Sequence, residues 1–121
     1  MKRAIVVGAT SGIGKELALV LSKNGFSVGL VGRRIELLEQ WKAVLPEPAF
    51  LKQIDVSEHS KAMSLLEELI EDMGGVDLVV VSAGTGFINP ALEWEQEKET
   101  IDVNVSGFAA MAGTAFRHFM K

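Results

Sequence analysis

The 121-residue chain is 48% hydrophobic and 23% charged and carries a net charge of −4, which is the composition of a soluble globular domain and not of a disordered segment. An acidic chain lacks the basic surface that general nucleic-acid binding requires, and no apolar run in the sequence approaches the roughly 18 residues of a membrane span. Cysteine is absent, and His59 and His118 are the only histidines, which excludes disulfides and metal sites built on thiols or on several histidines. We therefore expect one soluble, cytoplasmic domain over residues 1–121, with no metal, nucleic-acid or membrane partner.

The first predicted element is a buried strand over residues 4–7, because Ala-Ile-Val-Val is a continuous run of apolar, mostly β-branched residues. Glycines follow at Gly8, Gly12 and Gly14, and an apolar period of three to four residues then predicts a helix over 13–23. This order of strand, glycine-rich turn and helix brings backbone N–H groups and a positive helix N-terminus up to an anion, with no Cβ in the way. It predicts a phosphate-binding turn, and a purely structural turn is the alternative.

Strands and helices then alternate along the chain. The further predicted elements are a strand at 26–31, a helix at 35–45 before Pro46 and Pro48, a strand at 50–56, a helix at 62–73 with Ser57 as its N-cap, and a strand at 78–81. Every strand is a nearly continuous apolar run, which indicates burial on both faces and hence a parallel sheet covered by helices. Right-handed crossovers then predict a doubly wound α/β fold with strand order 3-2-1-4 and a crevice between strands one and four.

The last third of the chain is predicted to be helical. Residues 93–99 contain four glutamates and form a short solvated stretch. A long helix over 100–118 follows, and its apolar residues lie almost all round the helix. We expect such a helix to be buried against more than the sheet alone.

The glycine spacing, G-x-x-x-G-x-G, discriminates between the known phosphate-binding turns. A Walker loop requires a glycine where Ala9 stands and a hydroxyl residue for magnesium where Glu16 stands. The common dinucleotide fingerprint, G-x-G-x-x-G, has a different spacing as well. Both of these motifs are therefore excluded.

With this spacing the chain resembles the classical branch of the short-chain dehydrogenase/reductase family, whose fingerprint is T-G-x-x-x-G-x-G. Val7 stands in place of the threonine, and the resemblance covers essentially all 121 residues. It implies a Rossmann-type sheet, incomplete at its C-terminal half, that binds a nicotinamide dinucleotide. It assigns the contacts with the cofactor phosphates to the turn residues Gly8, Thr10, Ser11, Gly12, Ile13 and Gly14.

Gly32-Arg33-Arg34 follows the second strand and bears on the choice of cofactor. Enzymes that use NAD place an acidic residue there for the ribose 2′-hydroxyl, whereas a 2′-phosphate calls for a cation. Two arginines are also unfavourable beside a positive helix N-terminus, which favours a functional reason over a solvated arginine pair. We therefore predict NADP, with Arg33 as the main contact by its match to the family pattern and Arg34 in support. Ser11 departs from that pattern, since many NADP-using relatives carry a basic residue there.

The resemblance assigns further cofactor contacts at the ends of strands three and four. It implies that Asp55 accepts a hydrogen bond from the adenine amino group and that Val56 packs on the ring. From the residues alone, an aspartate before a serine-capped helix is more simply part of a turn. Val81-Ser82-Ala83-Gly84 stands in place of the family's N-N-A-G, so the small residues Ser82, Ala83 and Gly84 would let the cofactor ribose lie against the strand end.

Asn104 is the one catalytic residue that the resemblance assigns. Asparagine is unfavourable in the middle of a helix, because its side chain competes with the backbone for hydrogen bonds. In the family, the matching asparagine anchors a water molecule in the proton relay beside the catalytic lysine. A capping or helix-packing role is the alternative.

The resemblance also implies catalytic residues that this chain lacks. The family transfers a hydride between an alcohol and a carbonyl with a Tyr-x-x-x-Lys pair and a serine, and this sequence contains no tyrosine. We therefore predict the N-terminal fragment of an NADP-dependent oxidoreductase for small-molecule alcohols or carbonyls, inactive by itself. The alternative is a natural non-catalytic NADP-binding or regulatory module. The open apolar edge of strand four and the bare long helix predict a homo-oligomer.

Overall fold

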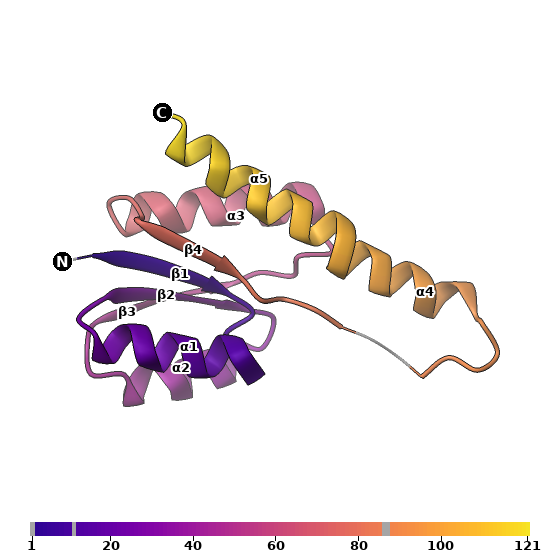
Figure 1. The fold of residues 1–121 in the computed structure, drawn as a ribbon, viewed down its shortest axis with the longest axis horizontal. Coiled ribbons are helices and arrows are strands. Elements are labelled where there is room, and N and C mark those ends of the chain that lie inside the picture. The colour runs from indigo at the N-terminus through magenta and orange to yellow at the C-terminus, as the bar shows by residue number, and fades with distance from the viewer. Residues whose placement is uncertain (1, 11, 86–87) are drawn as a thin grey trace.

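A computed structural model describes residues 2–10, 12–85 and 88–121 and has a parallel four-stranded sheet at its centre (Figure 1). The strands are β1 (Arg3–Val7), β2 (Ser27–Gly32), β3 (Ala49–Gln53) and β4 (Leu78–Val81). They lie in the order β3-β2-β1-β4, and every pairing is parallel. The doubly wound α/β fold and its predicted strand order are confirmed.

Helices cover both faces of this sheet. They are α1 (Gly12–Lys23), α2 (Ile35–Val44), α3 (His59–Asp72), α4 (Trp94–Ile101) and α5 (Phe108–Phe119). Figure 1 shows α1 and α2 on one face, α3 and α5 on the other, and α4 projecting past the end of the sheet. No helix in these described ranges is both long and apolar enough to cross a bilayer.

Each face of the sheet has its own hydrophobic core, because side chains alternate along a strand. Ile5 and Val7 of β1 pack toward α3 and α5, whereas Ala4 and Val6 pack toward α1 and α2. All six residues of β2 are buried, as expected for a central strand of a parallel sheet. The core therefore holds the three paired strand ends β1, β2 and β4 in fixed register.

That register brings the carboxyl ends of the strands to one edge. Val7 at the end of β1 pairs with both Val31 and Val81. Since β2 and β3 run to one side of β1 and β4 lies on the other, the crevice predicted by the reversal of strand order opens beyond Val7.

The structure corrects the prediction for residues 50–57. Strand β3 ends at Gln53 and not at residue 56. Ser57 is not the N-cap of α3: that position is Glu58, which makes no side-chain capping bond. Instead, the Asp55 Oδ1 accepts hydrogen bonds from the Ser57 N–H (3.0 Å) and hydroxyl (2.6 Å). This Asx turn diverts the chain from the sheet before the helix begins.

The long C-terminal helix also differs from the prediction. It begins at Trp94, earlier than residue 100, and is interrupted by a π-helical segment, Asp102–Gly107. Its apolar residues are only partly buried. Val103 and Met111 lie in the core, whereas Phe116 is 67% exposed. Helix α5 contacts α3 as well as β4, as expected, but its outer face is exposed.

Candidate functional site

The glycine-rich turn is built for close approach of backbone to backbone. Gly8 has φ of +95°, and a Cβ on it would lie 2.6 Å from the Ala83 backbone nitrogen. A Cβ on Gly14 would overlap the Gly8 carbonyl oxygen. The Gly8 and Ala9 N–H groups donate to the Val31 carbonyl oxygen at 2.9 and 3.0 Å. The turn therefore allows the start of α1 to pack closely against the ends of β1 and β4.

A crevice opens between this turn and the ends of the other strands. Nine of the predicted site residues line it: Gly8, Thr10, Arg33, Arg34, Asp55, Val56, Ser82, Ala83 and Gly84. The prediction missed other lining residues, of which Gly32, Ile54, Thr85 and Val103 are examples. Thr85 directly follows the predicted group 82–84, so its place after β4 was a usable signal. Val103 carried no comparable signal, because the sequence pattern marks it only as part of an apolar helix.

Three other predicted turn residues, Gly12, Ile13 and Gly14, lie outside the crevice lining. Gly12 and Gly14 form the first turn of α1 behind the crevice. Ile13 is 80% exposed and borders a shallow hollow on the outer surface of α1. Ser11 lies outside the described residues.

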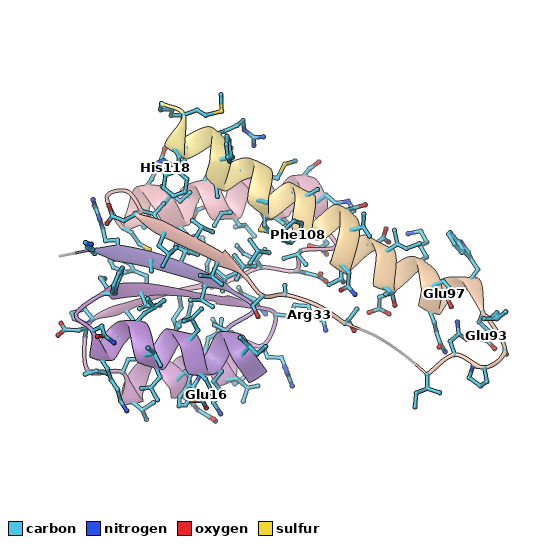
Figure 2. The ribbon with its side chains drawn as sticks, in the orientation of Figure 1. Glu16, Arg33, Glu93, Glu97, Phe108 and His118 are labelled. Carbon is cyan, nitrogen blue, oxygen red and sulfur yellow. The ribbon has the colours of Figure 1, made fainter. Side chains whose placement is uncertain are left out.

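The two arginines stand at the rim of the crevice between β2 and α2. Both are exposed, and Arg34 is the N-cap of α2, with no side-chain capping bond. The Gln53 side-chain amide donates to the Arg33 carbonyl oxygen at 2.9 Å, which ties this turn to the end of β3. Figure 2 shows Arg33 beyond the carboxyl ends of the strands. Two cations are thus placed where a helix N-terminus already attracts anions.

Asp55 supplies a negative charge on the same side of the crevice. Burial by itself would raise the pKa of the Asp55 carboxyl group, but the hydrogen bonds from the Ser57 side chain and backbone oppose this. Electrostatic attraction from the nearby Arg33 and His59 adds to that effect, and the net result is a lowered pKa for Asp55. A carboxylate that stays ionised is a strong hydrogen-bond acceptor. The crevice therefore offers cations and an acceptor side by side.

Asn104 fixes the chain that leaves β4. Its side-chain Nδ2 donates to the Thr85 carbonyl oxygen at 2.7 Å, and its Oδ1 accepts from the Thr85 N–H at 2.8 Å. Asn104 lies in the π-helical segment, a helix type that is rare and concentrated at functional sites. The paired bonds agree with the packing role that the sequence left as an alternative. They hold Thr85 at the crevice wall.

Gly107 joins the same segment to the end of β3. A Cβ on Gly107 would lie 2.9 Å from both the Val56 carbonyl oxygen and the Val56 Cγ2. The π-helical segment is thereby seated directly on Val56, which lines the crevice. Two crevice walls, at residues 55–56 and 82–85, are thus held by one helical segment.

Taken together, these groups suit an elongated ligand with negative charge and a hydrogen-bonding ring. The N-terminus of α1 attracts an anion, and the absence of a Cβ at Gly8 and Gly14 lets the turn pack closely beside it. The arginines and Asp55 lie further along the same crevice. The sequence has no tyrosine, so no phenol is available here for proton transfer.

Comparison with known proteins gives consistent matches. A family model described as short chain dehydrogenase matches residues 2–121. An uncharacterised oxidoreductase of Staphylococcus epidermidis is 38% identical over 122 residues, which cover 99% of this chain and 53% of that relative. The chain spans about half the length of the curated relatives it matches.

Two solved structures have the same fold over nearly the whole chain. A short-chain type dehydrogenase/reductase from Mycobacterium marinum is 29% identical with a TM-score of 0.89, and the match covers 97% of this chain and 49% of that one. An alcohol dehydrogenase from the archaeon Thermococcus sibiricus, complexed with 5-hydroxy-NADP, is 26% identical with a TM-score of 0.87. That match covers 98% of this chain and 53% of the other.

Proposed function

The chain belongs to the short-chain dehydrogenase family, and on this premise we propose that residues 1–121 form one dinucleotide-binding domain whose cofactor is NADP. The observation that carries the choice of NADP is the pair of arginines, Arg33 and Arg34, at the rim of the crevice. A 2′-phosphate is recognised by cations, and arginine binds phosphate with two parallel hydrogen bonds. The solved alcohol dehydrogenase in complex with 5-hydroxy-NADP adds support by analogy.

In this proposal, the residues of the crevice and of the adjoining glycine-rich turn bind different parts of the cofactor. Gly8, Gly12 and Gly14, with Thr10, Ser11 and Ile13, would take the phosphates at the N-terminus of α1. Arg33 would hold the 2′-phosphate and Arg34 would support it. The adenine would rest on Asp55 and Val56, and the small residues Ser82, Ala83 and Gly84 would leave room for a ribose.

The activity that we propose for the whole protein is transfer of a hydride between a small-molecule alcohol and a carbonyl. The nicotinamide group, when bound, accepts or delivers that hydride. The residues of this chain bind and orient the cofactor. Through its two hydrogen bonds to Thr85, Asn104 would hold the π-helical segment and the chain after β4 in place beside the reacting groups. Proton transfer needs a group that residues 1–121 lack, since the sequence has no tyrosine, and we propose that this chain is inactive alone.

The second candidate is a non-catalytic NADP-binding or regulatory module. It predicts cofactor binding with no turnover even for the intact gene product. Measuring NADPH oxidation by that product with a panel of small carbonyl compounds separates the two candidates, because only the oxidoreductase turns over.

The cofactor proposal is tested by titrating the chain with NADPH and NADH and following cofactor fluorescence. We expect NADPH to bind at least about tenfold more tightly, which corresponds to about 1.4 kcal/mol. Arg33→Ala should remove most of that preference. Arg117→Ala is the matched control, because Arg117 lies on α5 and pairs with Glu67 at 3.6 Å, outside the crevice lining. Equal affinity of the unmutated chain for both cofactors would refute the role given to Arg33.

A homo-oligomeric state and a cytoplasmic location are further parts of the proposal. The exposed apolar residues of the long helix, among them Val105 (61% exposed), support self-association. Light scattering at high micromolar concentration measures the assembly directly, and a monomer at that concentration would contradict it.

A further inference from the structure

A short connection, Arg33-Arg34, joins strand β2 to helix α2. In such a connection the direction of each arginine side chain depends on how the backbone is held. Helix α2 holds Arg34, because the Leu38 N–H donates to the Arg34 carbonyl oxygen at 3.2 Å. Within the described residues the Arg34 side chain makes no capping bond to the helix. The contacts that fix the Arg33 backbone must therefore come from other elements.

The ends of neighbouring segments hold this connection on two sides. A Cβ on Gly32 would lie 2.6 Å from the Thr10 Cγ2, so the last residue of β2 packs directly against the glycine-rich turn. On the other side, the Ile54 N–H donates to the Gly32 carbonyl oxygen at 3.0 Å. The pairing of β2 with β3 ends at this point, with Gly32 opposite Gln53.

The side chain of Gln53 extends this pairing by one residue. Its Nε2 donates to the Arg33 carbonyl oxygen at 2.9 Å, as the strand backbone does to the carbonyl oxygen of Gly32. Gln53 is itself exposed and occupies the last position of an edge strand. Packing in the core therefore does not require a glutamine here. What this side chain supplies is an uncharged donor within reach of the Arg33 carbonyl group.

Arg33 borders a cavity on each of two sides. One is the crevice, and the other is an outer hollow of about 310 Å³ that Arg33 lines together with Gln53, Asp55, Glu58 and Lys61. The carboxylate of Glu58 lies 3.8 Å from the Lys61 ammonium group, and both side chains are exposed. Carboxylates and phosphates both pair with a guanidinium group. The outer hollow therefore competes with the crevice for the Arg33 side chain.

We propose that Gln53 is a positioning residue for the choice of cofactor, because it holds the Arg33 backbone so that the guanidinium group is directed into the crevice and not into the outer hollow. Gln53 lines the outer hollow and not the crevice, so it acts through Arg33 and not on the cofactor itself. Fixing the backbone in advance reduces the conformational entropy that is lost when Arg33 binds a 2′-phosphate. This role of Gln53 rests on the role proposed above for Arg33.

A purely structural role for the Gln53 hydrogen bond is the alternative. In that role the bond stabilises the end of β3, and its loss weakens the binding of NADPH and NADH to the same extent. The two cofactors differ only in the 2′-phosphate. The ratio of their dissociation constants therefore isolates the contribution that is made through Arg33.

The test titrates the chain and its variants with NADPH and with NADH and follows cofactor fluorescence. Gln53→Met keeps a side chain of similar length but removes the donor. We expect it to lower the preference for NADPH about three- to tenfold, as for the loss of one hydrogen bond, while the affinity for NADH stays unchanged. Gln96→Met is the matched control, because Gln96 lies on α4, outside the crevice lining.

A double-mutant cycle shows whether Gln53 acts through Arg33. In the Arg33→Ala background the guanidinium group is gone, so Gln53→Met should leave the remaining ratio of affinities unchanged. Gln53→Glu is a second variant of the same shape, whose carboxylate has no donor and repels the Arg33 carbonyl oxygen. The preference for NADPH should fall at least as far in this variant as in Gln53→Met. Circular dichroism checks that each variant is folded, and Gln53→Glu replaces Gln53→Met in the cycle if the latter is not.

The outcomes separate the role of Gln53 from that of Arg33. If the unmutated chain binds both cofactors equally, both roles fail. If the unmutated chain prefers NADPH and the folded Gln53 variants keep the whole preference, only the role of Gln53 is overturned. An equal fall in affinity for both cofactors overturns it too, because Gln53 then only supports the fold. A fall in preference that persists in the Arg33→Ala background also overturns it, because Gln53 then does not act through Arg33.

Discussion

Replacing Gly8 by alanine tests whether the glycine-rich turn is required for close packing of the crevice. At this position the added Cβ would meet only backbone atoms, at 2.6 Å from the Ala83 nitrogen, 2.8 Å from the Ser82 carbonyl carbon and 2.9 Å from the Ala83 Cα. None of these can rotate away like the end of a side chain. The strand ends of β1 and β4 must therefore move apart.

Two costs add in this variant, and a control variant separates them. A non-glycine residue with positive φ costs about 1–2 kcal/mol, and overpacking costs about 1–3 kcal/mol more. Gly25 has φ of +87°, close to the +95° of Gly8, but a Cβ there would meet nothing within 4 Å. Gly25→Ala should therefore show the backbone cost alone, and Gly8→Ala should exceed it by about 1–3 kcal/mol.

Urea unfolding followed by circular dichroism gives the free energy of unfolding for both variants, provided that the slope m is unchanged. We also expect Gly8→Ala to weaken NADPH binding, because the displaced turn no longer presents its N–H groups, while Gly25→Ala binds like the unmutated chain. Equal destabilisation by the two substitutions would refute the argument from close contact.

Two further predictions concern the crevice walls. Asn104→Ala removes both hydrogen bonds to Thr85 and should lower the free energy of unfolding by about 1–3 kcal/mol. It should also speed hydrogen exchange of the Thr85 amide. An unchanged exchange rate would contradict the role of Asn104 in holding Thr85 in place. Asp55→Asn should cost about 1 kcal/mol near neutral pH, because Ser57 then donates to an uncharged oxygen. Because the folded pKa of Asp55 is lowered, its stabilisation is fully present above the ordinary aspartate pKa of about 3.9 and is lost as the pH falls through the folded value. Thermal unfolding from pH 7 to pH 3 should show this difference shrinking below about pH 4, and a difference of the same size at pH 7 and pH 3 would count against it.

The fold could be predicted from the sequence because each strand is recognisable by itself as a continuous apolar run. Continuous apolar runs separated by amphipathic helices admit few parallel topologies, and right-handed crossovers leave the order β3-β2-β1-β4. The glycine-rich turn at Gly8 could also be predicted from the residues, because it follows a buried strand and precedes a helix. Asp55 and Ser82, which line the same crevice, were assigned only through the resemblance to the family.

The details that the sequence could not supply depend on contacts between distant residues. Ser57 precedes a helix in the manner of an N-cap, but its hydroxyl instead donates to Asp55. The π-helical segment has no periodicity that distinguishes it from an α-helix. Its position depends on Gly107 approaching Val56 and on Asn104 reaching Thr85. Neither contact can be inferred from local spacing.

The place of β1 in the sheet has a consequence for synthesis on the ribosome. β1 is the first strand to be translated, yet it lies between β2 and β4 and so pairs on both sides. Its β2 partner is complete once Gly32 has emerged, but its other side waits for Leu78–Val81. At about 5–20 residues per second, that side of the nascent strand stays open for several seconds. Slow codons between β2 and β4 would lengthen this interval, in which the first strand is most vulnerable to pairing with the wrong chain.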